Sequence, residues 1–225
     1  MNIILDHVTV RFQDLPVLSN ISISLSERRI GVIGDNGSGK STFARLLNGL
    51  LIPDEGTVTV DGLCTHDKGN VVRRHVGFLF QNPDNQIVMP TVSEDLALGL
   101  KPLGLSSVEV NERVVSILEE FGLLHLQNRS AHLLSGGEKQ LVSLAGVMIV
   151  RPDILVCDEP TTLLDRRNAT RVMRLISSLA CSVVTVTHQV ERLVNYDRIL
   201  VISNGSISFD GKPSEAITFY ESTQV

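Results

Sequence analysis

The sequence predicts an α/β fold in which a parallel sheet is accompanied by a smaller antiparallel one. Strand-like and helix-like segments alternate through the second half of the chain, which indicates parallel strands joined by helices. In about the first sixty residues, apolar and polar positions alternate, as is typical of half-buried antiparallel strands. A glycine-rich loop also follows a strand-like run and precedes an amphipathic helix, the order that a phosphate-binding loop requires.

Each predicted element has its own pattern. Alternating strands are clearest at 21–25 and 57–60, and an apolar run at 29–34 predicts a buried strand before the glycine-rich loop. The helix predicted after the loop, 41–50, has an apolar stripe at i, i+3, i+4 and i+7. The residues of this stripe are Phe43, Leu46, Leu47 and Leu50.

The second half of the chain is expected to contain three helices and four strands. Two helices cover about 107–121 and 137–150, a third has Val172, Leu175, Ile176 and Leu179 on one face, and buried strands lie at 154–157 and 183–187. Asn204-Gly205 predicts a hairpin that joins strands 198–203 and 206–210, because both central residues of such a turn need a positive φ.

Composition limits the possible functions. Twenty basic and 25 acidic residues give a net charge of -5, which argues against binding to nucleic acid through a basic face. No uncharged stretch reaches the roughly 20 apolar residues of a membrane span, so membrane association is expected only through partner proteins. The three cysteines form no CxxC pair, and we expect reduced thiols with two of them in the core. They are Cys64, Cys157 and Cys181.

The glycine-rich loop carries the first chemical signal. Residues 34–41 fit the pattern GxxxxGK[ST], in which glycines let backbone N–H groups face phosphates at a helix N-terminus. Lys40 would reach the terminal phosphates, and the Ser41 hydroxyl can ligate magnesium. The alternative, a turn that only caps a helix, leaves both side chains unexplained. The predicted binding residues are Asp35, Asn36, Gly37, Ser38, Gly39, Lys40, Ser41 and Thr42.

Two further segments fit the same chemistry. Asp158 and Glu159 follow a buried strand, where α/β folds place their ligands. Asp158 would hold magnesium, directly or through water, and Glu159 would polarise a water for attack on a γ-phosphate. They could instead cap the following turn. The run 134–137, Leu-Ser-Gly-Gly, opens a helix and could form a second anion cradle or a simple helix cap.

Taken together, these motifs resemble those of the ATPase subunits of ABC transporters over nearly the whole chain. The segments, in the family's order, are Walker A at 34–42, the Q-loop Gln81, the signature at 134–137, Walker B ending at Asp158 and Glu159, the D-loop ending at Asp165, and the switch histidine His188. The resemblance implies a P-loop NTPase fold in one ATP-binding domain, 1–225, with a mixed sheet core, an antiparallel β subdomain and a helical signature subdomain at about 83–150.

The resemblance also implies roles for single residues. Two subunits, identical or related, would pack head to tail. Each ATP would then lie between the Walker A segment of one subunit and the signature of the other. Phe12 lies roughly where the family stacks an aromatic on adenine, with His7 and Arg11 as alternatives. Taken alone, Gln81, His188 and Phe12 could be a surface amide, a core histidine and a sheet-packing residue. The implied roles are catalysis for Lys40, Gln81, Glu159 and His188, magnesium binding for Ser41, Gln81 and Asp158, and ATP contact for Phe12, the loop, Ser135, Gly136, Gly137 and Asp165.

The sequence departs from the family at two points. The D-loop, 161–165, has a leucine where the family commonly has a small residue, and Glu138 replaces the usual glutamine after the signature glycines.

Rival classes of protein fit the sequence less well. Ribosome-acting or DNA-repair ABC ATPases need a second ATP-binding domain or a long coiled coil, a non-hydrolysing module would not need Glu159 and His188, and P-loop kinases and GTPases lack the signature.

The segments 82–86 and 92–100 resemble those of energy-coupling-factor importers, which take up vitamins and transition metals. The alternative is that Pro83 merely starts a turn. Many of these ATPases have an added C-terminal domain, whereas this sequence stops soon after the Asn204-Gly205 hairpin. The short form is expected to be most like the ATPase of the biotin importer, with cobalt or nickel importers as alternatives. The resemblance implies a peripheral protein on the cytoplasmic face of the membrane, with a T-type scaffold and a substrate-binding membrane component as partners and no nucleic acid.

Overall fold

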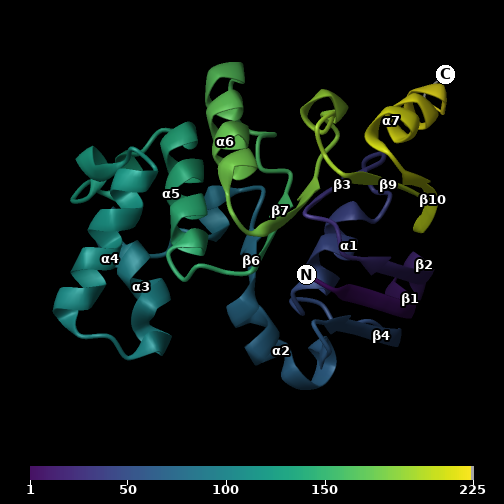
Figure 1. The fold of residues 1–225 in the computed structure, drawn as a ribbon, viewed down its shortest axis with the longest axis horizontal. Helices are drawn as coiled ribbons and strands as arrows, with labels where there is room; N and C mark the ends of the chain where they lie inside the picture. Colours follow the sequence, from purple (N-terminus) through teal and green to yellow (C-terminus); the bar gives the residue numbers. More distant parts are fainter. Residues whose placement is uncertain (224–225) are drawn as a thin grey trace. The chain divides into compact units, whose positions relative to one another are not determined.

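The computed structural model describes residues 1–223 and has an α/β architecture (Figure 1). The chain forms two compact units. The first comprises Met1–Phe78, Asp153–Glu159 and the chain from Ala180 onward, and the second comprises Leu79–Pro152 and Pro160–Leu179. The predicted fold class, with a mixed sheet, an antiparallel sheet and a helical part, is confirmed. The assignment of 1–225 to one domain with a helical subdomain at about 83–150 stays a prediction.

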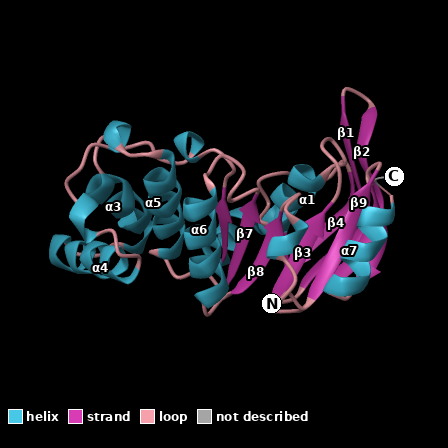
Figure 2. Cartoon of the chain, turned by 90° about the horizontal axis from the view of Figure 1, so that it is seen from above, coloured by secondary structure: helices cyan, strands magenta, loops and turns pink. Residues whose placement is uncertain are grey.

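The main sheet of the first unit has the strand order β10-β9-β3-β8-β7-β6. Figure 2 shows β3, β7, β8 and β9 side by side. Strand β3 runs parallel to both of its neighbours, β8 and β9, and β7 runs parallel to β8, while β10 is antiparallel to β9. The bounds are β3 Arg29–Ile33, β6 Val76–Leu79, β7 Ile154–Asp158, β8 Ser182–Val186, β9 Arg198–Ser203 and β10 Ser206–Gly211.

Three helices belong to the first unit with this sheet. Helix α1 (Lys40–Leu47) contacts β7 and β8, α7 (Pro213–Ser222) contacts β9 and β10, and α2 (Thr65–His75) contacts β4 and β5 of the second sheet. One 3₁₀ turn, Val190–Arg192, follows β8. The predicted hairpin between β9 and β10 is confirmed, because Asn204 and Gly205 have φ values of 48° and 73°.

The smaller sheet of the first unit is antiparallel, with the strand order β2-β1-β4-β5. A two-residue turn, Gln13-Asp14, joins the first two strands, and both of its residues have a positive φ. The predicted alternation is confirmed at 21–25, because Ile21 and Leu25 are buried while Ser22 and Ser24 are exposed. The bounds are β1 Ile3–Phe12, β2 Leu15–Leu25, β4 Glu55–Val60 and β5 Leu63–Cys64.

The second unit is helical and is built around α5 (Gly136–Met148), which contacts α3 (Val92–Leu100), α4 (Ser107–Glu120) and α6 (Arg166–Ser178). Helices α3, α4 and α5 each begin with a capping box, in which a Ser or Thr and a Glu satisfy each other's backbone N–H groups. The short 3₁₀ turns of this unit are Pro83–Asn85, Lys101–Leu103, Leu124–Leu126 and Ala131–Leu133.

Two expectations from the sequence are corrected. The helix after the glycine-rich loop ends at Leu47, because Gly49 takes a left-handed φ of 67°, and Leu50 is therefore 44% exposed. All three cysteines are free thiols, but only Cys157 is buried, so the expectation of two core cysteines was wrong. Within residues 1–223, no helix has both the length and the apolar character needed to cross a membrane.

Candidate functional site

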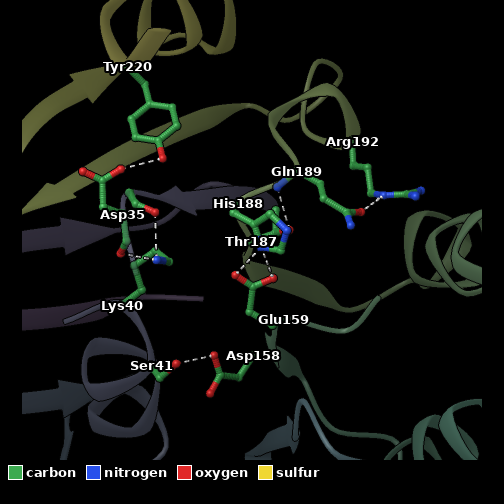
Figure 3. Close-up of polar contacts among 11 residues, drawn as sticks. Asp35, Lys40, Ser41, Asp158, Glu159, Thr187, His188, Gln189, Arg192 and Tyr220 are labelled. Atoms are coloured by element: carbon green, nitrogen blue, oxygen red, sulfur yellow. Dashed lines mark hydrogen bonds and ion pairs between the residues drawn. The ribbon is translucent and has the colours of Figure 1, made fainter. Parts of the chain in front are cut away.

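The glycine-rich loop connects the buried strand β3 to helix α1 in the first unit. Gly39, with a φ of 105°, is the N-cap of α1, and the Ser38 backbone N–H donates to the Asp35 carbonyl at 3.1 Å. The Lys40 Nζ donates to the carbonyls of Gly34 at 2.8 Å and Asp35 at 2.7 Å (Figure 3). These two hydrogen bonds hold the Lys40 amine against the loop, at the start of α1. The N-terminal dipole of a helix favours anions.

Burial and nearby charge act against each other at Lys40. Burial lowers the pKa of its amine, and the carboxylates of Glu159, Asp35 and Asp158 oppose that shift. The pKa of Lys40 stays below its usual value, because burial outweighs the attraction of the three acidic neighbours. The hydroxyl of Ser38, also buried, has no hydrogen-bond partner among residues 1–223, so the loop retains a polar atom that a bound phosphate can satisfy.

The β9–β10 hairpin supports the loop through backbone contacts. The Gly205 N–H donates to the Ser38 carbonyl at 3.2 Å. A Cβ atom at Gly34, where φ is 148°, would lie 2.1 Å from the Ile202 carbonyl oxygen, whereas a Cβ at Gly37, where φ is 79°, would meet nothing within 4 Å. Gly34 is therefore required by close packing, and Gly37 only by its backbone conformation.

These two glycines give a matched prediction. We expect Gly34→Ala to lower the midpoint of thermal unfolding by at least several degrees and to abolish ATP binding, because the loop must move away from β9 to admit the methyl group. Gly37→Ala meets only the left-handed backbone penalty of about 1–2 kcal/mol and should unfold closer to the wild type. Calorimetry on both variants is the measurement, and equal midpoints would contradict the steric explanation.

The side chains of Ser41 and Asp158 meet at the end of β7, next to α1. The Ser41 hydroxyl donates to Asp158 Oδ1 at 2.8 Å (Figure 3). Burial raises the pKa of the Asp158 carboxyl, and the Ser41 hydrogen bond partly offsets this. Among residues 1–223, no three His, Cys, Asp or Glu side chains could hold a metal ion by themselves. One hydroxyl and one carboxylate do fit Mg²⁺, which usually takes one or two protein oxygens together with phosphates and water.

Glu159 and His188 form the second polar pair of the site. Glu159 is buried, has a φ of 51°, and donates its backbone N–H to the Val186 carbonyl at 2.9 Å. The Nδ1 of His188 lies 3.1 Å from both carboxylate oxygens of Glu159. A non-glycine residue with a positive φ is strained, and such strain is concentrated at functional sites. The carboxylate is thus held in one orientation by its backbone and by the histidine.

The turn that carries His188 is itself fixed. The backbone N–H of Gln189 donates to the Thr187 hydroxyl at 3.1 Å, and the Arg192 guanidinium contacts the Gln189 side-chain oxygen (Figure 3). The histidine side chain remains 46% exposed while Glu159 is buried. The structure therefore brings together Lys40, Ser41, Asp158, Glu159 and His188, all of which the sequence had predicted as site residues.

The signature and D-loop residues lie together in the second unit. Ser135 is the N-cap of α5: its hydroxyl accepts from the Glu138 N–H at 3.3 Å. Hydrogen bonds from Ser135 hold the pKa of Glu138 below its usual range. Asp165 caps α6 by accepting from the Asn168 N–H at 2.9 Å, and a Cβ at Gly137 would lie 2.4 Å from the Asn168 side chain. A Cβ at Gly136 would meet no other part of residues 1–223 within 4 Å. Ser135 thus does cap its helix, which was the alternative to an anion cradle. Contact of ATP with Ser135, Gly136, Gly137 and Asp165 stays a prediction.

The segment after Gln81 is organised by its own side chains. Gln81 is exposed. Asn82 accepts from the Asp84 N–H at 3.0 Å, and the Lys139 amine binds Asp84 at 2.6 Å. The second glutamine, Gln86, accepts from Phe80 and donates to the Ser143 carbonyl of α5. This last contact joins the segment to α5.

Phe12 and its two alternatives lie on the antiparallel sheet. Phe12 ends β1 and is 64% exposed. Arg11 pairs with Glu55 at 2.8 Å, and His7 with Asp6 at 2.7 Å. The His7 side chain is also largely exposed, so exposure does not distinguish these two aromatic candidates, and contact of Phe12 with adenine stays a prediction. Sequence reasoning missed Tyr220 of α7, whose hydroxyl meets Asp35 of the loop; no local pattern marks a contact made by so distant a segment.

The comparisons with known proteins agree with this geometry. Residues 18–162 match the model of the ABC transporter family. An ABC transporter ATP-binding protein of Bartonella henselae is 52% identical over 215 residues, which cover 96% of this chain and 95% of the relative. This chain belongs to the ABC transporter family, and it is an ATP hydrolase whose cassette binds ATP.

Two other relatives are more informative about the subgroup. The biotin transport ATP-binding protein BioM of Rhizobium etli is 44% identical over 220 residues, which cover 98% of each chain. The energy-coupling factor transporter ATP-binding protein EcfA1 of Symbiobacterium thermophilum is 45% identical over 202 residues, which cover 86% of this chain and 70% of the relative. They confirm the resemblance to ATP-binding subunits of the energy-coupling-factor type.

Solved structures confirm the fold. The cbiO1 protein of Clostridium perfringens, described as part of the ABC transporter complex cbiONQ, matches with a TM-score of 0.85 at 28% identity, covering 99% of this chain and 92% of that one. The ATP-binding cassette MJ0796, as a post-hydrolysis dimer bound to ADP and Pi, matches with the same score and identity, covering 94% of this chain and 98% of that one.

Proposed function

We propose that this chain is the ATP-binding and ATP-hydrolysing subunit that energises an energy-coupling-factor-type importer, with biotin as the transported solute. The identity with BioM over nearly the full length of both chains is the observation that carries this proposal. Two subunits, identical or related, work at the cytoplasmic face of the membrane with a T-type scaffold and a substrate-binding membrane component. A cobalt or nickel importer of the same type is the second candidate, because the likeness to EcfA1 supports the energy-coupling-factor type without naming biotin.

The contacts in the first unit support a division of roles within the reaction. Lys40 and the N–H groups of the loop bind the phosphates of ATP. Glu159 accepts a proton from a water molecule as the oxygen of that water attacks the γ-phosphorus in line, and ADP departs with the electrons of the broken P–O bond. His188 holds the Glu159 carboxylate through Nδ1. Its exposed ring is proposed to contact the γ-phosphate.

Magnesium binding is proposed for a small set of oxygens. Ser41 and Asp158 would hold Mg²⁺, which neutralises charge on the phosphates when it is bound. Gln81 is proposed as a third ligand, and Phe12 as the adenine platform. Ser135, Gly136, Gly137 and Asp165 are proposed to contact the ATP that is bound mainly by the other subunit.

Purification from native membranes tests the transport assignment. The affinity-tagged chain should be recovered with two integral membrane proteins, one common scaffold and one that retains a small molecule. Glu159→Gln is the matched control, because it should assemble equally well but not support uptake of labelled biotin into cells that lack the wild-type chain. Uptake of labelled cobalt or nickel instead of biotin would support the second candidate, and recovery only in the soluble fraction with ribosomes would overturn both.

A further inference from the structure

One side chain connects helix α7 with the phosphate-binding loop. The Tyr220 hydroxyl donates to Asp35 Oδ1 at 2.9 Å, between residues 185 positions apart in the sequence (Figure 3). Burial, and then the adjacent Asp35 carboxylate, raise the pKa of Tyr220 to about 12, so this hydroxyl keeps its proton at neutral pH. A hydrogen bond from a neutral hydroxyl to a carboxylate is stronger than one between two neutral groups.

The position of Tyr220 is fixed by the packing of α7. Ala216, one turn earlier, is fully buried in an apolar cluster that also contains Ile33, the last residue of β3 before the loop. The rings of Phe209 and Phe219 stack with centroids 5.0 Å apart, which joins α7 to β10. Helix α7 and the start of the loop therefore share one apolar base, and Tyr220 extends from that base to the loop.

Asp35 is the residue through which this contact affects the loop. Its carbonyl accepts from both the Ser38 N–H and the Lys40 Nζ. A restraint on the Asp35 side chain therefore also restrains the turn that Asp35 begins. This turn places the Lys40 amine and the backbone N–H groups that are expected to face phosphate. Preorganising a binding loop improves affinity, because less conformational entropy is lost when the ligand binds.

We propose that Tyr220 is a positioning residue for ATP: its hydrogen bond to Asp35 holds the phosphate-binding loop in its binding conformation from helix α7. This inference rests on the proposed function of the loop as the ATP site. Because the Tyr220 hydroxyl donates to Asp35 rather than to Glu159 or His188, its loss should weaken ATP binding and leave the chemical step nearly unchanged.

The chain contains only two tyrosines, which supplies a matched control. The hydroxyl of Tyr196 pairs with the Thr185 hydroxyl at 2.8 Å, and its ring lies in the same apolar cluster. Both Tyr→Phe changes remove one hydroxyl and keep the ring. Tyr220→Phe should raise the Kd for a non-hydrolysable Mg-ATP analogue, and the KM for ATP, about fivefold, with kcat changed less than about twofold. Tyr196→Phe should lower thermal stability more but leave the Kd unchanged.

A double variant tests whether the effect passes through Asp35. Asp35→Ala should weaken analogue binding, and adding Tyr220→Phe should weaken it no further, because both changes remove the same hydrogen bond. Asp35→Asn keeps an acceptor oxygen and should show a smaller loss than Asp35→Ala. An unchanged Kd in Tyr220→Phe, an equal change in Tyr196→Phe, or additive losses in the double variant would overturn the proposal.

Hydrogen exchange separates this proposal from the assignment of the ATP site. Without nucleotide, peptides that span 34–42 should exchange faster in Tyr220→Phe than in the wild type, and at the wild-type rate in Tyr196→Phe. Equal rates in all three proteins would overturn the restraint by Tyr220 whatever the ATP affinity. Failure of the wild-type protein to bind the analogue would instead refute the ATP site, while the exchange rates would still report on the restraint.

Discussion

Replacing Glu159 with Gln is expected to reduce the steady-state rate of ATP hydrolysis by about 10²- to 10⁴-fold, the usual contribution of a general base. The amide has nearly the shape of the carboxylate but cannot accept the proton of the attacking water. It can still meet His188 Nδ1, which lies 3.1 Å from both oxygens of the native side chain. Phosphate release at saturating Mg-ATP is the measurement.

The same variant should still bind ATP, because Glu159 makes no phosphate contact in the proposed mechanism. Its Kd for Mg-ATP should stay within a few-fold of the wild type, and its unreacted ATP should favour the two-subunit complex in sedimentation experiments. Glu191→Gln, which changes a carboxylate in the 3₁₀ turn Val190–Arg192, is the matched control and should hydrolyse ATP normally. Near-normal turnover by Glu159→Gln would refute the assigned role.

Replacing Lys40 with Ala should weaken the binding of Mg-ATP by roughly 10- to 150-fold. Hydrogen bonds to charged groups typically contribute about 1.5–3 kcal/mol, and this factor follows from that range. The amine is buried at the start of α1 and is held over the loop by the carbonyls of Gly34 and Asp35. The loop N–H groups remain in the variant, so some affinity should persist. Isothermal titration with a non-hydrolysable analogue gives the comparison.

Lys101→Ala is the control for this change, because it removes a lysine charge from an exposed position in the second unit. Its ATP affinity should equal that of the wild type. The Lys40→Ala protein must also unfold near the wild-type temperature, so that lost binding reflects the missing amine. An affinity close to that of the wild type in a folded Lys40→Ala protein would exclude the proposed phosphate contact.

Local patterns identified much of the fold and most of the first-unit site. The loop at 34–41 could be predicted because strand, glycines, lysine and hydroxyl lie within a few positions of one another. Helices α2, α3 and α7 were not predicted. In α2 the only apolar residues are the adjacent Val71 and Val72, so its sequence shows no apolar stripe.

The sequence by itself determined which residue types are available for phosphate chemistry and in which order along the chain they occur, because each motif is a short run with its own spacing. Only the tertiary structure decided which of these groups meet. Ser41 reaches Asp158 and His188 holds Glu159 because parallel strands bring their ends to one edge of the sheet. Tyr220 meets Asp35 because α7 packs against β9 and β10. Such contacts join residues far apart in the chain, and their geometry depends on the packing of whole elements rather than on any local pattern.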